Sequence, residues 1–259
     1  MSAFDLRNAM FLDGTIVAIG GLRGNAPNPG GGGGGPSGPI SKDGASHWNA
    51  SNTSTVAGGS LTTTLTNDLI VAMYSGVRGS AAIATVSGVT SSSGLVFTRL
   101  GGITSPLQSG SKHINVEVWT APAAAALTNE VITFTLTGAV TCNCAGAVAL
   151  HGVIGTSGIY TLDGLVLTNV AANSGSPSVT MTTTYANDVI IYALGLNATS
   201  TVLPPTGFTQ DAADHQFTGL QGEGISLSHN IEATTQTGLL LRGSPNTLGA
   251  CVAFALKGS

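Results

Sequence analysis

Charge is what this sequence has least of. Charged residues make up 8% of the chain, against about 25% in ordinary soluble domains. The 8 Lys and Arg and the 12 Asp and Glu residues are spread thinly and leave a formal net charge of −4. No cluster of basic residues forms the patch that nucleic-acid binding requires, so we expect no nucleic-acid partner. Such a chain suits a rigid β-rich protein packed in an assembly better than a freely diffusing enzyme.

Cysteine and long apolar runs are also scarce. The three cysteines are Cys142, Cys144 and Cys251, and the spacing of the first two differs from the CxxC pair of metal and redox sites. We interpret all three as small buried apolar residues and expect no disulfide framework. No apolar run approaches 18 residues, so no membrane-spanning helix is predicted. Residues 1–10 lack a basic segment followed by an apolar one, so we expect no secretory signal.

What the sequence does contain is a repeat. Residues 62–74 recur as residues 182–194, with Asp68 recurring as Asp188, at a constant offset of 120 positions. Each copy has three threonines, then an Asn-Asp pair, then an apolar run rich in β-branched residues. This order predicts a Thr-rich strand, a turn and a buried strand. The correspondence extends over residues 43–155 and 160–259, which we interpret as a tandem duplication.

The patterning within each copy indicates strands. Short apolar segments separated by turn clusters are typical of an all-β sandwich or barrel. Residues 113–120 alternate, with Ile114, Val116 and Val118 on one face, whereas residues 69–74 are apolar on both faces. The second pattern predicts a central strand that is covered on both sides. The predicted fold is therefore all-β, with two tandem antiparallel β-sandwich, jelly-roll-like domains at 43–155 and 160–259.

Residues 1–42 are predicted to form a separate N-terminal segment. Residues 15–19 read as a short strand, and a Gly/Pro-rich stretch with six glycines at 30–35 follows. We interpret the glycines as a flexible connector, with close packing of bare backbone against a neighbouring chain as the alternative. A nucleotide-binding glycine loop is not predicted, because Pro36 follows and no helical pattern begins there.

The order of segments carries a family resemblance. A Thr-rich strand leads to Asn-Asp and a β-branched strand, then Gly-x-x-Phe-Thr at 94–98, an alternating strand with Trp119, and an Ala-rich strand ending in His151. This resembles the β-sandwich modules in structural proteins of tailed bacteriophages and phage-like particles, such as minor tail, fibre, spike and decoration proteins. The second copy departs from the pattern, because it lacks the tryptophan and has Pro204-Pro205 before a shortened Gly-Phe-Thr.

Two groups of side chains are candidates for contacts with ligands. Trp48 and Trp119 could stack sugar rings if they are exposed, whereas packing in a core or interface is the alternative. Asp211, Asp214 and His215 form the densest polar cluster. Carboxylates and an imidazole at this spacing could bind a cation, a glycan or a protein, and a solvated loop tip between strands explains them equally well.

The recurring Asp68 and Asp188 could ligate a metal, but we interpret Asn-Asp before a strand as a turn pair whose side chains cap local amides. No catalytic motif is present, so we predict no enzyme, cofactor or metal, while a hydrolase built from distant residues stays an alternative. We expect functional surfaces where the copies differ, in predicted loops at 76–93, 101–112 and 197–221.

The resemblance implies a function in a particle. It implies a virion structural protein of the tail, fibre, head spike or decoration type, made in the host cytoplasm and contributing to host-surface attachment. Residues 1–42 would dock to other virion proteins, and the chain would form trimers or higher rings. The alternative is a carbohydrate-binding adhesin module without a virion role, with a host-surface glycan as its partner.

Overall fold

The protein consists of strands and turns. The computed structural model describes residues 9–12, 15–18, 39–79, 84–105, 112–154, 159–164, 166–171, 175–197, 201–218, 221–245 and 247–258. These residues contain strands and no helix, which confirms the predicted all-β class. The chain divides into two units, Met1–Gly33 and Gly34–Ser259.

The first unit contains one hairpin. Strand β1 (Ala9–Leu12) pairs antiparallel with β2 (Thr15–Ala18). The strand predicted at residues 15–19 is thus confirmed over 15–18. The glycine run at 30–35 lies outside the described residues, so its interpretation as a connector stays a prediction.

In the second unit, the first copy builds a six-stranded sheet. Five of its strands follow the order β3-β8-β4-β7-β6, and β5 pairs with β8 off this path. All pairs are antiparallel. The bounds are β3 (Ser41–Leu61), β4 (Asp68–Gly79), β5 (Val86–Ser91), β6 (Thr98–Thr104), β7 (Lys112–Ala123) and β8 (Glu130–His151).

The second copy builds a five-stranded antiparallel sheet in the order β12-β13-β11-β15-β9, and β10 and β14 form a separate pair. The bounds are β9 (Leu167–Ala171), β10 (Ser178–Met181), β11 (Asp188–Leu196), β12 (Thr209–Thr218), β13 (Gln221–Glu232), β14 (Leu239–Arg242) and β15 (Gly249–Leu256). All three regions predicted as loops therefore contain strand residues, because β5 lies within 76–93, β12 lies within 197–221 and the end of β6 lies within 101–112.

The two large sheets correspond strand by strand. Strand β4 matches β11, β7 matches β13 and β8 matches β15, so the two orders are the same. Even a local irregularity recurs, because β6 shifts register between Arg99 and Gly101 and β12 shifts between Gln210 and Ala212. A bulge preserved in both copies supports the tandem duplication.

The two sheets pack face to face through a shared core. Leu69 and Val71 of the first copy and Val189 and Ile191 of the second belong to one buried apolar cluster. Contacts between the sheets come in reciprocal pairs: β12 lies against β3 and β8, and β6 lies against β9 and β15. Reciprocal contacts of this kind are typical of a two-fold interface. The copies therefore pack like the subunits of a symmetric dimer joined in one chain.

Small residues allow the sheets to approach. A Cβ atom added to Gly146 of β8 would lie 2.7 Å from the Cβ of Ala212 on β12. A Cβ atom added to Gly195 of β11 would overlap the hydroxyl of Ser75 on β4. Ser75 and Gly195 are equivalent positions of the repeat, so they meet at the pseudo-two-fold axis.

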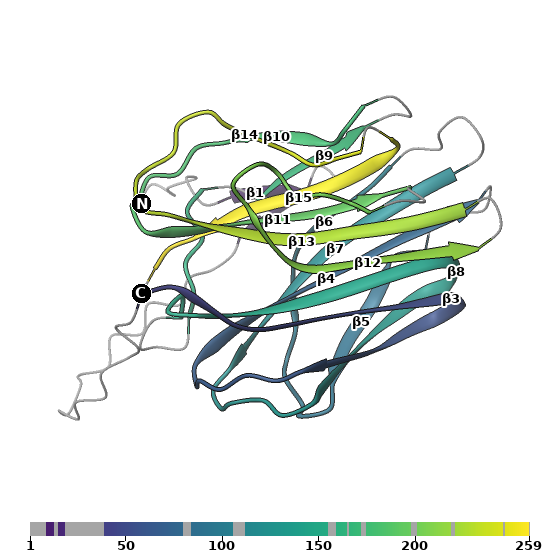
Figure 1. Cartoon of the computed structure of the whole chain (residues 1–259), viewed down its shortest axis with the longest axis horizontal. Helices are drawn as coiled ribbons and strands as arrows, with labels where there is room; N and C mark the ends of the chain where they lie inside the picture. The colour runs from purple at the N-terminus through teal and green to yellow at the C-terminus, as the bar shows by residue number, and fades with distance from the viewer. Residues whose placement is uncertain are drawn as a thin grey trace, which may run out of the picture. The chain divides into compact units, whose positions relative to one another are not determined.

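Each copy also has an apolar cluster of its own on the outer face of its large sheet. In the first copy, Tyr74, Ile132 and Phe134 pack beneath β5 and the paired halves of β3 and β8. In the second copy, Tyr192 and Leu241 pack between the large sheet and the β10–β14 pair. Figure 1 shows β10 and β14 at one side of this unit and β5 at the other, with the large sheets between.

The strand at residues 69–74 is buried on both faces as predicted. Leu69, Val71 and Met73 face the shared core, whereas Ile70 and Tyr74 face the core of the first copy. All are fully buried, and burial of a large apolar side chain contributes about 1.5–3 kcal/mol. Burial on both faces explains why this strand stays apolar in both copies, although only Ile70 is identical in the second copy, as Ile190.

Candidate functional site

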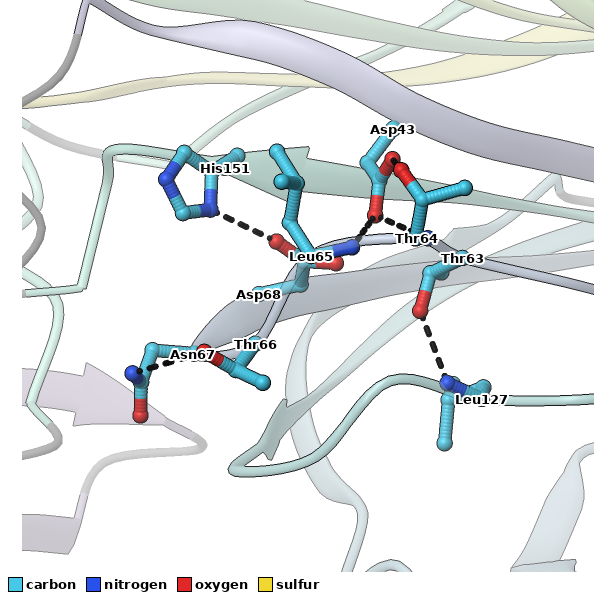
Figure 2. A network of polar contacts seen from close by, with 9 residues as sticks. All are labelled: Asp43, Thr63, Thr64, Leu65, Thr66, Asn67, Asp68, Leu127 and His151. Atoms are coloured by element: carbon cyan, nitrogen blue, oxygen red, sulfur yellow. Dashed lines mark hydrogen bonds and ion pairs between the residues drawn. The ribbon is translucent and has the colours of Figure 1, made fainter.

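The turn between β3 and β4 is held by the carboxylate of Asp43. The backbone N–H groups of Thr64 and Leu65 each donate to Asp43 Oδ2 at 2.7 Å, and the Thr64 hydroxyl donates to Oδ1 at 2.6 Å. Figure 2 shows these side chains around the turn. Burial opposes ionisation of Asp43, but the hydrogen bonds from Thr64 and Leu65 lower its pKa. Asp43 therefore caps the turn as a carboxylate.

The other repeated residues each have a structural role in the same turn. Thr63 exchanges two hydrogen bonds with Leu127, from its N–H to the Leu127 carbonyl at 3.0 Å and from the Leu127 N–H to its hydroxyl at 2.8 Å. Asn67 has a φ of 62°, in the left-handed region that Asn tolerates better than most residues. The interpretation of residues 67–68 as a turn pair thus holds for the Asn67 backbone, whereas the carboxylate that caps the amides is Asp43.

The second copy repeats this construction. The Thr184 N–H and hydroxyl donate to Asp163 at 2.5 Å each, and the Tyr185 N–H donates to Asp163 at 3.0 Å. Thr183 exchanges backbone and hydroxyl hydrogen bonds with Gln236 at 2.9 and 2.8 Å. Asn187 has a φ of 61°. The bonding pattern therefore recurs at the equivalent positions of the repeat.

Asp68 and Asp188 are buried acids, with 1% and 0% of their surface exposed. Burial, together with a hydrogen bond to the carboxyl of Asp163, raises the pKa of Asp188 to about 7. Burial and the carboxyl of Asp43 likewise raise the pKa of Asp68 to about 6. Each turn therefore contains two carboxyl groups that titrate far apart.

In the second copy, the carboxyl groups of Asp163 and Asp188 share one proton. Burial opposes ionisation of Asp163, but hydrogen bonds from Asp188, Thr184 and Tyr185 lower its pKa to about 2. Neither carboxyl oxygen of Asp188 meets a hydrogen-bond donor among the described residues. A proton carried by Asp188 and donated to the Asp163 carboxylate satisfies both groups.

A basic residue at the end of the last strand faces each buried acid. In the first copy His151 Nδ1 lies 3.0 Å from Asp68 Oδ1, as Figure 2 shows. The equivalent residue of the second copy is Lys257, whose positive charge lowers the pKa of Asp188 and whose Nζ lies 4.1 Å from the ring centre of Tyr185. We call Asp43, Thr64, Asp68 and His151 the first turn site, and Asp163, Thr184, Asp188 and Lys257 the second.

The predicted polar cluster lies on a strand rather than at a loop tip. Asp211 sits at the bulge of β12 with its side chain fully buried. It accepts a hydrogen bond from His229 at 2.7 Å, and Lys42 Nζ lies 3.4 Å from its Oδ1. Lys42 lies on β3, so this group links the two large sheets.

Asp214 links the copies as well. The amide of Asn49 on β3 is 3.0 Å from each of its carboxyl oxygens. His215 is exposed, and its backbone N–H donates to Asp214 Oδ1 at 2.7 Å. We call Lys42, Asn49, Asp211, Asp214 and His229 the rim. Sequence reasoning missed Lys42, Asn49 and His229, because they lie far along the chain from the cluster.

The two tryptophans differ in exposure. Trp48 is 8% exposed, its Nε1 donates to the Val56 carbonyl at 3.4 Å, and its ring centre lies 6.1 Å from that of Phe134. This matches the core-packing alternative for Trp48. Trp119 is partly buried against the same core, and its Nε1 is buried without a hydrogen-bond partner in the described part of the chain. Of the two, Trp119 is the more exposed.

One buried acid had no sequence signal. Glu223 of β13 is fully buried, and the hydroxyl of Ser75 donates to its Oε1. Burial raises its pKa well above the usual range, and its Oε2 has no partner among the described residues. Glu223 is therefore a neutral acid within the packed sheets.

No protein-family model, curated protein or solved structure matches the chain. Over the described residues, no group of three or more His, Cys, Asp or Glu side chains is arranged to hold a metal ion. The same residues contain no helix that is long and apolar enough to span a membrane. The turn sites and the rim are therefore assessed from their own geometry.

Proposed function

We propose that this chain is a structural component of a phage or phage-like particle, in the tail, fibre, head spike or decoration class. The main support is the way the copies are joined. Two duplicated sheets share one buried core and are tied at the rim by Lys42–Asp211 and Asn49–Asp214. A double module of this kind transmits force and position without hinge motion between its halves, as a projecting particle component requires.

In this proposal each copy is a sandwich module, over residues 43–155 and 160–259. The support is that each copy has a second apolar core on the outer face of its large sheet. The segment 1–42 docks the chain to other virion proteins, and the chain assembles as a trimer or higher ring. The low charge, 8% of residues, fits a protein that is packed among neighbours in a virion.

Mass spectrometry of gradient-purified particles from producing cells tests this function. We expect the particles to contain the chain at a fixed ratio to the other particle proteins. Light scattering of the purified free protein should show a complex of at least three chains. A chain found only in the unassembled fraction would contradict the proposal. Because Gly34–Ser259 is a compact unit of its own, a version lacking residues 1–33 should fold but fail to enter particles. If the version lacking residues 1–33 enters particles normally, the N-terminal segment has no docking role.

Glycan binding is a second candidate, supported by the partial exposure of Trp119. Aromatic rings on β-sandwiches can stack sugar rings. If Trp119 binds a glycan, Trp119→Ala should abolish the glycan-array signal of the intact chain. Val96→Ala is the matched control, because Val96 is 79% exposed and lies in the same copy. An array without signal for the unmodified chain would exclude this candidate.

A further inference from the structure

The two turn sites lie at the same end of the large unit. Gly258, next to Lys257, lies against both the Asn187 carbonyl and the side chain of Ile40. Ile40 directly precedes β3, which carries Asp43, while Asn187 belongs to the second turn. The two carboxyl pairs are thus placed where the chain enters this unit.

We propose that the two carboxyl pairs are proton-operated latches on the duplicated turns, which hold this end of the unit closed in mild acid and loosen as the pH rises to neutral. The geometry carries this inference. In each site one carboxylate caps the turn through two backbone N–H groups, and the other acid is buried beside it. The latch is independent of the role of the chain in a particle.

Loss of the proton removes the hydrogen bond that joins the two acids. In the second site, Asp188 then meets no hydrogen-bond donor within the described part of the chain and faces the Asp163 carboxylate in a buried position. Two adjacent buried carboxylates repel strongly, so one of them must move to water. Either movement releases the amides of Thr184 and Tyr185, because Asp163 caps both.

The groups that face Asp188 come from three elements besides its own turn. Asp163 precedes β9, and Lys257 follows β15. Glu232 of β13 is opposite Asp188 in the sheet register and is bound by the amides of Asn230 and Gln236 at 2.5 and 3.0 Å. Around Asp188 there are thus three acids, Asp163, Asp188 and Glu232, and one base, Lys257. The acids outnumber the bases.

Asp68 has different neighbours. Asp43 belongs to β3 and His151 to the end of β8, while the residue opposite Asp68 on β7 is the uncharged Ala123. The hydrogen bond from His151, whose Nδ1 lies 3.0 Å from Asp68 Oδ1, lowers the pKa of Asp68 and partly offsets the effect of burial. We therefore expect the first latch to release at lower pH than the second, in line with pKa values of about 6 for Asp68 and about 7 for Asp188.

Hydrogen exchange of the intact chain from pH 5 to pH 8, corrected for the intrinsic pH dependence of exchange, tests the latches. The reporters are the amides of Thr64, Leu65, Thr184 and Tyr185. In the second site, the protection of the amides against exchange should fall by up to about tenfold per pH unit and level off near pH 7. In the first site, the protection should fall in the same way and level off near pH 6. Constant or rising protection over this range in both turns would overturn the proposal.

The variant Asp188→Asn tests the assignment to one proton. Its neutral amide can donate to Asp163 at every pH, so protection of Thr184 and Tyr185 should stay high and flat while the first turn still responds. Asp214→Asn is the matched control and should leave both profiles unchanged, because Asp214 contacts Asn49 at the rim. If Asp188→Asn does not fold, Asp68→Asn provides the equivalent test. Protection of Thr64 and Leu65 should then stay flat while the second turn still responds to pH. A variant that keeps the unmodified pH profile would refute the latch.

Discussion

The closest approach between the two large sheets predicts a definite penalty for one added methyl group at Gly146. A Cβ atom there would lie 2.7 Å from the Cβ of Ala212 and 3.5 Å from Ile225 Cδ1. The Cβ atom of Ala212 is fixed to its backbone and cannot rotate away, so the sheets themselves must shift. Overpacking of a close-packed core costs about 1–3 kcal/mol, and we expect Gly146→Ala to lower the unfolding free energy by that amount.

Gly88 is the matched control. It lies on β5, where an added Cβ atom meets nothing within 4 Å. Gly88→Ala should therefore be neutral or raise the unfolding free energy by up to about 1 kcal/mol, because alanine restricts the unfolded chain. The contrast between the two variants separates steric conflict at the sheet interface from the general effect of replacing glycine.

A double-mutant cycle tests whether the conflict lies between the copies. Ala212→Gly removes the methyl group that the new Cβ would meet, and alone it should cost about 1 kcal/mol. In the Gly146→Ala/Ala212→Gly variant, the methyl group is simply moved to the other sheet. The two effects should then be less than additive by at least about 1 kcal/mol.

Equilibrium unfolding in guanidinium chloride, followed by the fluorescence of the buried Trp48, gives the required free energies. Each variant must keep the slope of the unmodified protein for the comparison to apply. The reasoning is refuted if Gly146→Ala and Gly88→Ala agree within about 0.5 kcal/mol, or if the cycle is additive within that range. Either result would mean that the sheets are not in contact at Gly146.

Three further predictions concern the polar sites. Asp188 alone should lower the free energy of unfolding by up to about 4 kcal/mol from about pH 4 to pH 7 in urea titrations, because its pKa of about 7 in the folded state exceeds its usual 3.8 and the unfolded chain loses the proton first; the raised pKa of Asp68 acts in the same direction. Asp211→Ala should cost about 3 kcal/mol because it leaves His229 unpaired in a buried position, whereas Asp214→Ala should cost less than about 1 kcal/mol in the same assay. Asn67→Val should lower the melting temperature while Asn67→Gly does not, because the φ of 62° favours glycine over a β-branched residue.

The repeat made much of the fold predictable. Residues 69–74 are apolar on both faces, and this is readable because each side chain of a strand faces one of two layers. Ile114, Val116 and Val118 likewise face the shared core together. Such patterns depend on neighbours within one strand, so they appear in the sequence directly.

The packing of one copy on the other was not predictable in the same way. Nothing near Gly146 indicates that it faces Ala212, because the contact depends on how two complete sheets are stacked. The roles of the acids were hidden for the same reason. Asp43 caps a turn 21 residues ahead of it, and Asp214 meets Asn49 across a separation of 165 residues. The positions of side chains that depend on their own strand were predictable, whereas the contacts of side chains that join distant strands were not.

The pseudo-symmetry explains why the acidic cluster stands out in the sequence. Asp211 occupies the bulge of β12, and the equivalent bulge position on β6 is Leu100. Its partner Lys42 corresponds to Leu162 in the repeat, and both leucines pack against the shared core. The positions of the Lys42–Asp211 ion pair are thus taken at the equivalent place by two leucines that pack against the shared core. An ion pair with one partly exposed partner adds little stability over apolar packing, so we interpret the difference as a source of specificity. In this interpretation the charged pair favours one of the two ways in which sheets of the same strand order can face each other.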